Sequence, residues 1–368
     1  MRAALSKEGS THTPAVICYE GIFIRDHWAQ LTDSPWWHMY ETDIEKQAKW
    51  REDAVRAAGY EWFLLPKCAS RTDRAHKSIS VEPDGVYQTD GRSPDKRKLE
   101  EPVVSGNTIQ IWHRDIKAET PDDIDALIPA PAGDAGSLIN DGGGDLAERL
   151  LTGFCGQMCP IAHVNSPFAG CVSLWGFEGF MLKLYDDPGL VKRARDRYFL
   201  WCEAQIKEAA ALGVEVIWIE ECYVDMVGPE QFRTFNYNCL NELTGLIRAA
   251  GMQSVYYPCG DPWNKMDQYL SVGADAVSFE ESKKGFEIDI EDVVDAVNGK
   301  CAVLGNLDAI WLLPYCTEDE LKTEINRQLK AGRRNGGRFI MSMGSPVTPG
   351  TSVKRVKLYC DLVRGLTE

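Results

Sequence analysis

The sequence predicts an α/β protein of the (β/α)8 TIM-barrel class. Eight short apolar runs of the kind that form buried strands alternate along the chain with amphipathic helical segments. This alternation indicates right-handed βαβ units and a parallel sheet, and eight is the strand number of a closed barrel. A chain of 368 residues suits one such barrel, so we expect a single domain over residues 1–368. An open, doubly wound sheet is the structural alternative.

The predicted strands fall into two groups, which are separated by an insertion. The first group lies in the N-terminal part of the chain and consists of Ala15–Tyr19 and Trp62–Leu65. The second group consists of six runs, each rich in β-branched, aromatic or small apolar residues. These are Ile161–Asn165, Val214–Ile219, Gln253–Tyr257, Ala276–Phe279, Cys301–Gly305 and Phe339–Met343.

The helices between these strands carry clear start and stop signals. Proline in the first turn and glycine after the last turn mark several of them, and Thr317 with Glu320 forms a capping box. A helix through Ile44 and Val55 should stop at Gly59. Two further helices are predicted to begin at Asp187-Pro188 and Gly228-Pro229 and to end at Gly213 and Gly251.

An insertion over residues 70–144 follows the second predicted strand. Within it, Ser78–Val81 and Val86–Gln88 flank Pro83-Asp84-Gly85, a pattern that predicts a β-hairpin with an Asp-Gly turn. Thr108–Trp112 is a candidate third strand. The basic run Lys96-Arg97-Lys98 sits among acidic residues and is interpreted as a solvated loop.

Composition narrows the classes of function. The net charge of −15 argues against nucleic-acid binding, because contact with phosphates needs a basic surface. No apolar run reaches the ~18 residues that would indicate a membrane-spanning helix. The N-terminus lacks the apolar segment of a signal peptide, so a cytoplasmic location is expected. Twelve cysteines are then expected to be free or metal-bound rather than paired.

Acids and thiols gather where four consecutive predicted strands end. The third to sixth strands lead into Asn165, Glu220-Glu221-Cys222, Tyr257-Pro258-Cys259 and Glu280-Glu281. In a TIM barrel the active site lies at these carboxyl ends. A thiolate from Cys259 and a carboxylate from Glu280 at one end of a sheet are typical of a metal site. The alternative for Cys259 is ordinary packing, since cysteine is among the most buried residue types.

From Ser166 to the C-terminus the chain resembles the uroporphyrinogen decarboxylase superfamily, and specifically its cobalamin-dependent methyltransferase branch. The resemblance rests on a series of motifs in a characteristic order rather than on any single one. They are Asp187-Pro188, Gly228-Pro229-Glu230-Gln231-Phe232, Pro258-Cys259-Gly260, Gly305-Asn306-Leu307-Asp308, Thr317 to Leu321, and Pro346-Val347-Thr348-Pro349-Gly350-Thr351.

The resemblance implies a (β/α)8 barrel but argues against decarboxylation of porphyrinogens. The decarboxylases carry an arginine-rich segment near the N-terminus. Here the equivalent place is occupied by Tyr19-Glu20-Gly21-Ile22-Phe23-Ile24-Arg25, with one arginine. We therefore expect Glu20 and Arg25 to contact a smaller substrate.

The methyltransferase branch usually binds zinc through His-x-Cys at one strand end and a second cysteine near the last strand. This chain keeps Cys259 and has Glu280, but Tyr257 replaces the histidine and Ser345 replaces the last cysteine. We expect a zinc ion held by Cys259 and Glu280, completed by Cys222 and Glu221. A zinc site of this kind would act as a Lewis acid toward an ether oxygen.

The alternative is a site without metal, in which Tyr257 or a glutamate protonates the leaving group. Tyr257, Glu220 and Asn165 are accordingly the catalytic candidates. For the substrate we predict contacts with His163 and with the aromatic pair Trp36-Trp37. These two indoles can stack on a flat methoxylated ring, or simply pack the barrel mouth.

These features predict a methyltransferase that moves a methyl group from a small O-methyl substrate, such as an aryl methyl ether, to Co(I) of a separate corrinoid protein. The chain has no Asp-x-His-x-x-Gly motif for binding cobalamin itself. Two alternatives remain. One is transfer from methylcobalamin to a thiol such as coenzyme M, and the other is a decarboxylase-like lyase or a non-catalytic barrel.

Overall fold

A curled parallel sheet of seven strands forms the centre of the protein. The computed structural model describes residues 1–107, 118–283 and 285–367. The strand order is β1-β5-β6-β7-β8-β9-β10, and every neighbouring pair is parallel. The strands are β1 (Trp62–Leu64), β5 (Cys159–Asn165), β6 (Val216–Glu221), β7 (Gln253–Pro258), β8 (Ala276–Ser278), β9 (Ala302–Leu304) and β10 (Phe339–Ile340). These are the last seven of the eight predicted strands.

The first predicted strand, Ala15–Tyr19, is reduced to a short bridge that connects the two edges of this sheet. Ala15 pairs in parallel with Met341, just beyond β10, and the Val16 N–H donates to the Met341 carbonyl at 2.8 Å. On the other side the Glu61 N–H, next to β1, donates to the Ala15 carbonyl at 2.9 Å. The run ends at Tyr19 because its backbone turns to φ 53°, and a helix begins at Glu20. The arrangement is TIM-barrel-like.

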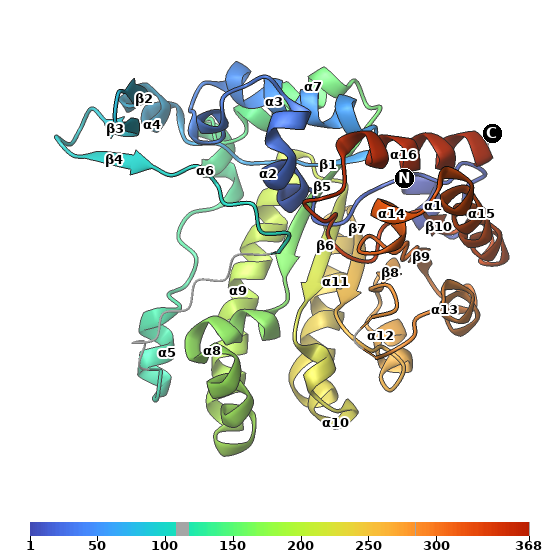
Figure 1. Ribbon diagram of the computed structural model, residues 1–368. Helices are drawn as coiled ribbons and strands as arrows, with labels where there is room; N and C mark the ends of the chain where they lie inside the picture. Colours follow the sequence, from blue (N-terminus) through green and yellow to red (C-terminus); the bar gives the residue numbers. More distant parts are fainter. Residues whose placement is uncertain (108–117, 284, 368) are drawn as a thin grey trace.

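Helices surround the sheet (Figure 1), and the predicted ones begin and end close to their signals. Helix α3 (Ile44–Ala58) stops at Gly59 in the left-handed conformation, and α9 (Pro188–Leu212) stops at Gly213 in the same way. The helix predicted from Gly228-Pro229 is three consecutive pieces, α10 (Pro229–Phe232), a π-helical turn η3 (Arg233–Tyr237) and α11 (Asn238–Ala249). Helix α15 (Glu318–Arg334) carries the complete Thr317 capping box.

The remaining helices are mostly short and connect or cover the strands. They are α1 (Arg2–Leu5), α2 (Glu20–Leu31), η1 (Trp36–Tyr40), α4 (Arg71–His76), α5 (Pro121–Leu127), α6 (Ala135–Asn140), α7 (Asp145–Phe154), α8 (Pro167–Asp186), η2 (Val224–Met226), α12 (Met266–Ser271), α13 (Ile290–Val297), α14 (Leu312–Tyr315) and α16 (Val353–Thr367).

The insertion contains a separate antiparallel sheet, which projects from the body of the molecule in Figure 1. Strands β2 (Lys77–Glu82) and β3 (Gly85–Asp90) form the predicted hairpin. The third strand is β4 (Lys96–Leu99), so the expectation of a solvated loop at Lys96-Arg97-Lys98 is wrong. These lysines and the arginine are exposed on an edge strand, where charged side chains protect against further pairing. Thr108–Trp112 lies outside the described residues.

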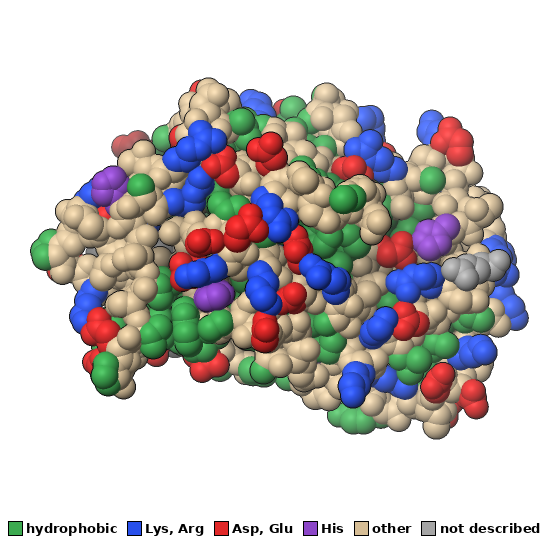
Figure 2. Space-filling model, turned by 90° about the horizontal axis from the view of Figure 1, so that it is seen from above, with side chains coloured by type: hydrophobic (Ala, Val, Ile, Leu, Met, Phe, Trp, Pro, Cys, Tyr) green, Lys and Arg blue, Asp and Glu red, His purple; other side chains and the backbone are tan. Residues whose placement is uncertain are grey.

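Charged side chains of both signs are spread over the surface. Figure 2 shows basic and acidic side chains interspersed on the face that it presents, without a broad basic field. Within the described part of the chain, none of the helices combines the length and the apolarity needed to cross a membrane.

Candidate active site

Three predicted catalytic residues lie in one row across neighbouring strands. Asn165 of β5 is the register partner of Glu220 of β6, and Glu220 is the register partner of Tyr257 of β7. Register partners in a parallel sheet project toward the same face. The row is at the carboxyl ends of the strands, which is where TIM-barrel active sites lie.

Aromatic rings pack around this row. The ring of Tyr257 lies 5.0 Å from Trp218 and 5.8 Å from Tyr19 between centroids. His163 stacks on Trp218 at 5.9 Å and meets Tyr19 edge-on at 6.3 Å. Burial lowers the pKa of His163 to about 4, so its imidazole is neutral at physiological pH. The row is therefore bordered by uncharged rings.

Glu220 accepts hydrogen bonds from two neighbours. The Tyr19 hydroxyl donates to Glu220 Oε1 at 3.0 Å, and the Cys222 thiol donates to the same oxygen at 3.1 Å. Tyr19 and Tyr223, which directly follows Cys222, both have left-handed backbones, with φ of 53° and 68°. Such conformations are strained for tyrosine, and strain of this kind gathers at functional sites.

Two predicted metal ligands, Cys222 and Cys259, lie in contact. Their sulfur atoms are 3.5 Å apart. Both side chains are half-buried, so the pair can be reached from solvent. The contact with the Cys259 sulfur, together with burial, raises the pKa of Cys222 well above its usual value. Cys222 is thus a neutral thiol in the free protein.

Glu280 pairs with a lysine, Lys283, which no sequence pattern indicates. Lys283 Nζ lies 2.7 Å from Glu280 Oε1 and donates to Ser345 Oγ at 2.6 Å. The other carboxylate oxygen of Glu280 accepts from the Gly260 N–H at 2.9 Å. Glu281 Oε1 is 3.8 Å from the same ammonium. Burial lowers the pKa of Lys283, but its bond to Glu280 and the nearby negative charges outweigh that effect and raise the pKa overall.

A glycine allows the ends of β7, β8 and β10 to approach so closely. A Cβ atom on Gly344 would lie 2.2 Å from the Glu281 nitrogen, so no other residue fits there without displacement. The Tyr257 hydroxyl donates to the Gly344 carbonyl at 2.7 Å and is buried. This bond fixes the segment that carries Ser345 beside Lys283.

Glu221 lies on the opposite side of β6 from Glu220, because successive side chains of a strand alternate. It is fully buried and accepts a short hydrogen bond from the Ser166 hydroxyl. Burial raises the pKa of Glu221 to about 8. Glu221 therefore belongs to the packing between the sheet and the helices.

The four predicted zinc ligands do not fit a zinc ion. Cys222 and Cys259 converge, but Glu221 points elsewhere and both oxygens of Glu280 already have partners. Over residues 1–107, 118–283 and 285–367, no group of three or more His, Cys, Asp or Glu side chains has an arrangement that could hold a metal. We derive no step through zinc.

The predicted substrate-binding residues Glu20 and Arg25 already have partners within the protein. Glu20 is buried and accepts from the Tyr60 hydroxyl at 2.8 Å, and burial raises its pKa to about 7. Arg25 pairs with Asp26 at 2.7 Å. Both are thus engaged in contacts that fix helix α2, which the sequence pattern could not reveal.

Trp36 and Trp37 lie in η1, with their rings edge-on at 5.7 Å. The Tyr40 carbonyl of the same turn accepts from Gln88 of β3. The turn thereby contacts the hairpin sheet. This position agrees with the packing alternative for the two indoles better than with stacking on a substrate beside Tyr257.

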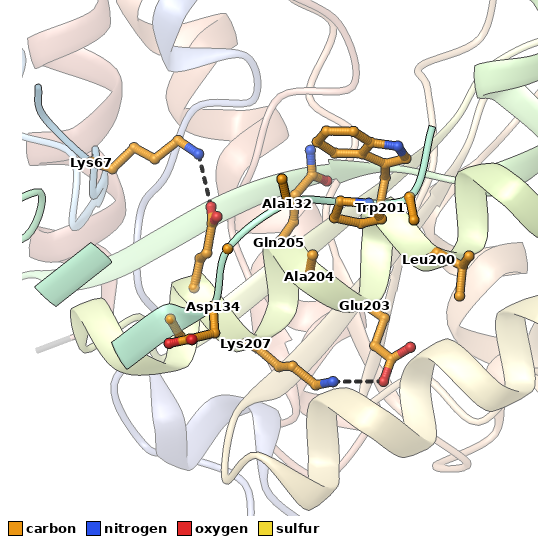
Figure 3. Close-up of a pocket in the computed structure, with 14 residues that line it drawn as sticks. Lys67, Ala132, Asp134, Leu200, Trp201, Glu203, Ala204, Gln205 and Lys207 are labelled. Carbon is orange, nitrogen blue, oxygen red and sulfur yellow. Dashed lines mark hydrogen bonds and ion pairs between the residues drawn. The ribbon is translucent and has the colours of Figure 1, made fainter. Parts of the chain in front are cut away.

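Two hollows lie next to α9 on the outer side of the sheet. One, of about 350 Å³, is lined by α9, by residues 130–135 and by Lys67 (Figure 3). In it Lys207 pairs with Glu203, and Trp201 covers one side. The other, of about 440 Å³, reaches Asn165 and Ser166. Asn165, which stands in the row of catalytic candidates, is exposed and also lines this hollow.

Comparison with known proteins places the chain in a family. Residues 120–366 match the uroporphyrinogen decarboxylase family. The chain belongs to that family. This confirms the resemblance inferred from the ordered motifs, and the matched region begins before Ser166, where those motifs start. No curated protein sequence matches the chain.

Among solved structures, a methyltransferase from Methanosarcina mazei is similar over 98% of this chain and 96% of its own, with a TM-score of 0.64 and 19% identity. At this identity the likeness shows the fold. A D-psicose 3-epimerase from Clostridium cellulolyticum covers 69% of this chain and 93% of its own at 12% identity, with a TM-score of 0.38.

Proposed function

We propose that the protein is a methyltransferase that moves a methyl group from a small O-methyl substrate, such as an aryl methyl ether, to Co(I) of a separate corrinoid protein. The observation that carries the proposal is the row of Asn165, Glu220 and Tyr257 at the strand ends, bordered by aromatic rings. The similarity of fold to a methyltransferase supports it. We take the fold to be a closed (β/α)8 barrel, in which the bridge at Ala15 is the strand that joins β1 to β10 and completes the eight.

The reaction requires a hydrogen-bond donor for the leaving oxygen and a surface that holds the substrate. Breaking the methyl–oxygen bond leaves both electrons on the oxygen, which then needs a proton or a hydrogen bond. The hydroxyls of Tyr19 and Tyr257 are neutral, because burial holds the pKa of each well above its usual value. Each now donates elsewhere, to Glu220 and to the Gly344 carbonyl, and would turn from that acceptor to serve the leaving oxygen. The rings of Tyr257 and Trp218 are buried, so the half-buried rings of Tyr19 and His163 are the ones that an aromatic substrate would contact.

The methyl acceptor in this proposal belongs to another protein. Co(I) supplies the electron pair of the new bond to carbon, so no further oxidant or reductant is needed. The chain itself has no Asp-x-His-x-x-Gly motif. We accordingly expect no turnover by the purified chain alone, and we place the reaction in the cytoplasm.

The test is to mix the chain with a reduced corrinoid protein and candidate methoxyarenes and to follow the spectrum of the corrinoid. We expect methylation only when all three are present. Glu220→Gln should slow it, since Glu220 orients Tyr19, whereas Glu215→Gln, at the other end of β6, should not.

Two other results would contradict the proposal. Consumption of methylcobalamin by coenzyme M or another thiol, without demethylation of any ether, would assign the reverse direction of transfer. Release of carbon dioxide from a carboxylated substrate would indicate a lyase.

A further inference from the structure

We infer that the ammonium group of Lys283 is the resident cation of this active site and occupies the position that a divalent metal would otherwise take. Its neighbours are the groups that a metal would attract. Glu280, Glu281 and Ser345 surround Nζ at 2.7, 3.8 and 2.6 Å.

The two departures from the zinc-binding pattern are explained by this lysine. Ser345, which stands where the resemblance implies a cysteine, accepts a hydrogen bond from Lys283. Tyr257, which stands where it implies a histidine, donates to the Gly344 carbonyl and so holds the segment before Ser345. A cysteine or histidine would be a metal ligand at these positions. A serine and a tyrosine at these positions instead form hydrogen bonds that position an ammonium group.

The surroundings of the Lys283 ammonium group are largely buried. The Lys283 side chain is only 17% exposed, and those of Glu280 and Glu281 are 9% and 4% exposed. Partly desolvated ion pairs of this kind persist only where the geometry is specific. Close contact at Gly344 and the Gly260 N–H bond to Glu280 bring the three strand ends together around Nζ.

The ammonium group of Lys283 has a third N–H that can donate to a ligand. Among the described residues, Lys283 Nζ donates to Glu280 and to Ser345, and Glu281 lies beyond hydrogen-bond distance. An ammonium carries three donors. The third suits an oxygen acceptor on a ligand, and, if the proposed function is right, this acceptor is the oxygen that loses the methyl group.

Metal binding tests the inference independently of methyl transfer. The purified full-length chain, with its thiols reduced, is titrated with cobalt(II), and thiolate-to-cobalt absorption is recorded. We expect no such absorption from the wild type. Lys283→Ala frees Glu280 beside Cys222 and Cys259, and we expect it to gain the absorption. Lys354→Ala removes an exposed lysine elsewhere and should behave as the wild type.

A second series restores the ligands that the family pattern implies. Tyr257→His with Ser345→Cys should bind zinc at least ~10-fold more weakly than the same pair combined with Lys283→Ala, because the ammonium repels the metal. Equal affinities would overturn the inference. So would a wild-type chain that holds one zinc ion and loses it in Cys259→Ala, and this measurement decides even if the lysine variants do not fold.

Discussion

Neighbouring residues of one strand show how position decides role in this site. Glu220 and Glu221 are adjacent acids in β6, yet Glu220 accepts from Tyr19 and Cys222 at the strand ends while Glu221 is buried against Ser166. The sequence identified both as candidates, but it could not assign each to a face. A strand boundary that is uncertain by one residue exchanges the two faces.

The burial of Glu221 predicts how the stability of the protein depends on pH. The pKa of Glu221 is raised from its ordinary value to about 8 in the folded protein, so the folded state favours the protonated carboxyl. As the pH rises from the ordinary pKa of a glutamate to about 8, the unfolded state ionises first, and the folded protein loses stability. Glu221→Gln cannot ionise. We expect the variant to gain stability relative to the wild type between about pH 5 and pH 8 in urea unfolding.

Equal pH dependence of the two proteins would contradict this account of Glu221. Glu20, whose pKa is also raised, is present in both proteins and so cancels in the comparison.

Tyr257 and Tyr256 provide a similar contrast in β7. The Tyr257 hydroxyl donates to the Gly344 carbonyl on the site side, whereas Tyr256 packs against Tyr269 on the other face. We expect Tyr257→Phe to lower the methyl-transfer rate by ~10²-fold, because it removes a donor and loosens the Ser345 segment. Tyr256→Phe should keep the rate near that of the wild type. Similar rates for both variants would place Tyr257 among packing residues.

At the scale of elements, the site depends on three strand ends that meet with almost no space between them. Gly344 is the closest point, since any Cβ there would contact the backbone of Glu281. We expect Gly344→Ala to lower the free energy of unfolding by about 1–3 kcal/mol and to reduce activity, as overpacking displaces Ser345. Gly350→Ala, in the same segment with nothing within 4 Å of its Cβ position, is the matched control. An equally stable Gly344→Ala protein would show that the contact can relax.

The elements also show what sequence patterns can predict here. Strands β5 to β10 are buried apolar runs, and the Thr317 and Gly213 caps are local signals, so these could be predicted. The strand β4 could not, because an exposed edge strand of lysine and arginine has no apolar period. Ala15–Tyr19 was apolar enough for a strand, but the left-handed backbone of Tyr19 ends it early.

The site was predictable to a similar extent. Residues adjacent in sequence to strand ends, such as Cys222 and Cys259, were found and do converge. Lys283 was missed because it lies three residues beyond Glu280 in a loop, and its contact with Ser345 joins residues 62 positions apart. Long-range ion pairs of this kind leave no local pattern. The Glu280-Glu281 pair beside a lysine was the one available signal.

The whole molecule is a barrel-like protein with aromatic rings, acids and the Lys283 ammonium at its strand ends, and the methyl acceptor that we propose belongs to another protein. The chain belongs to the uroporphyrinogen decarboxylase family, and its fold is similar to that of a methyltransferase. The same scaffold serves different chemistries in different proteins, so the direct evidence must come from the reaction itself.

The most direct measurement follows the methyl group. The chain is incubated with a reduced corrinoid protein and a methoxyarene whose methyl group carries deuterium, and both products are analysed by mass spectrometry after one turnover. The account predicts a trideuteromethyl group on the corrinoid and an equal amount of the phenol. A corrinoid without the label would contradict it, and so would transfer of the trideuteromethyl group to water or to a thiol in a mixture that contains no corrinoid protein.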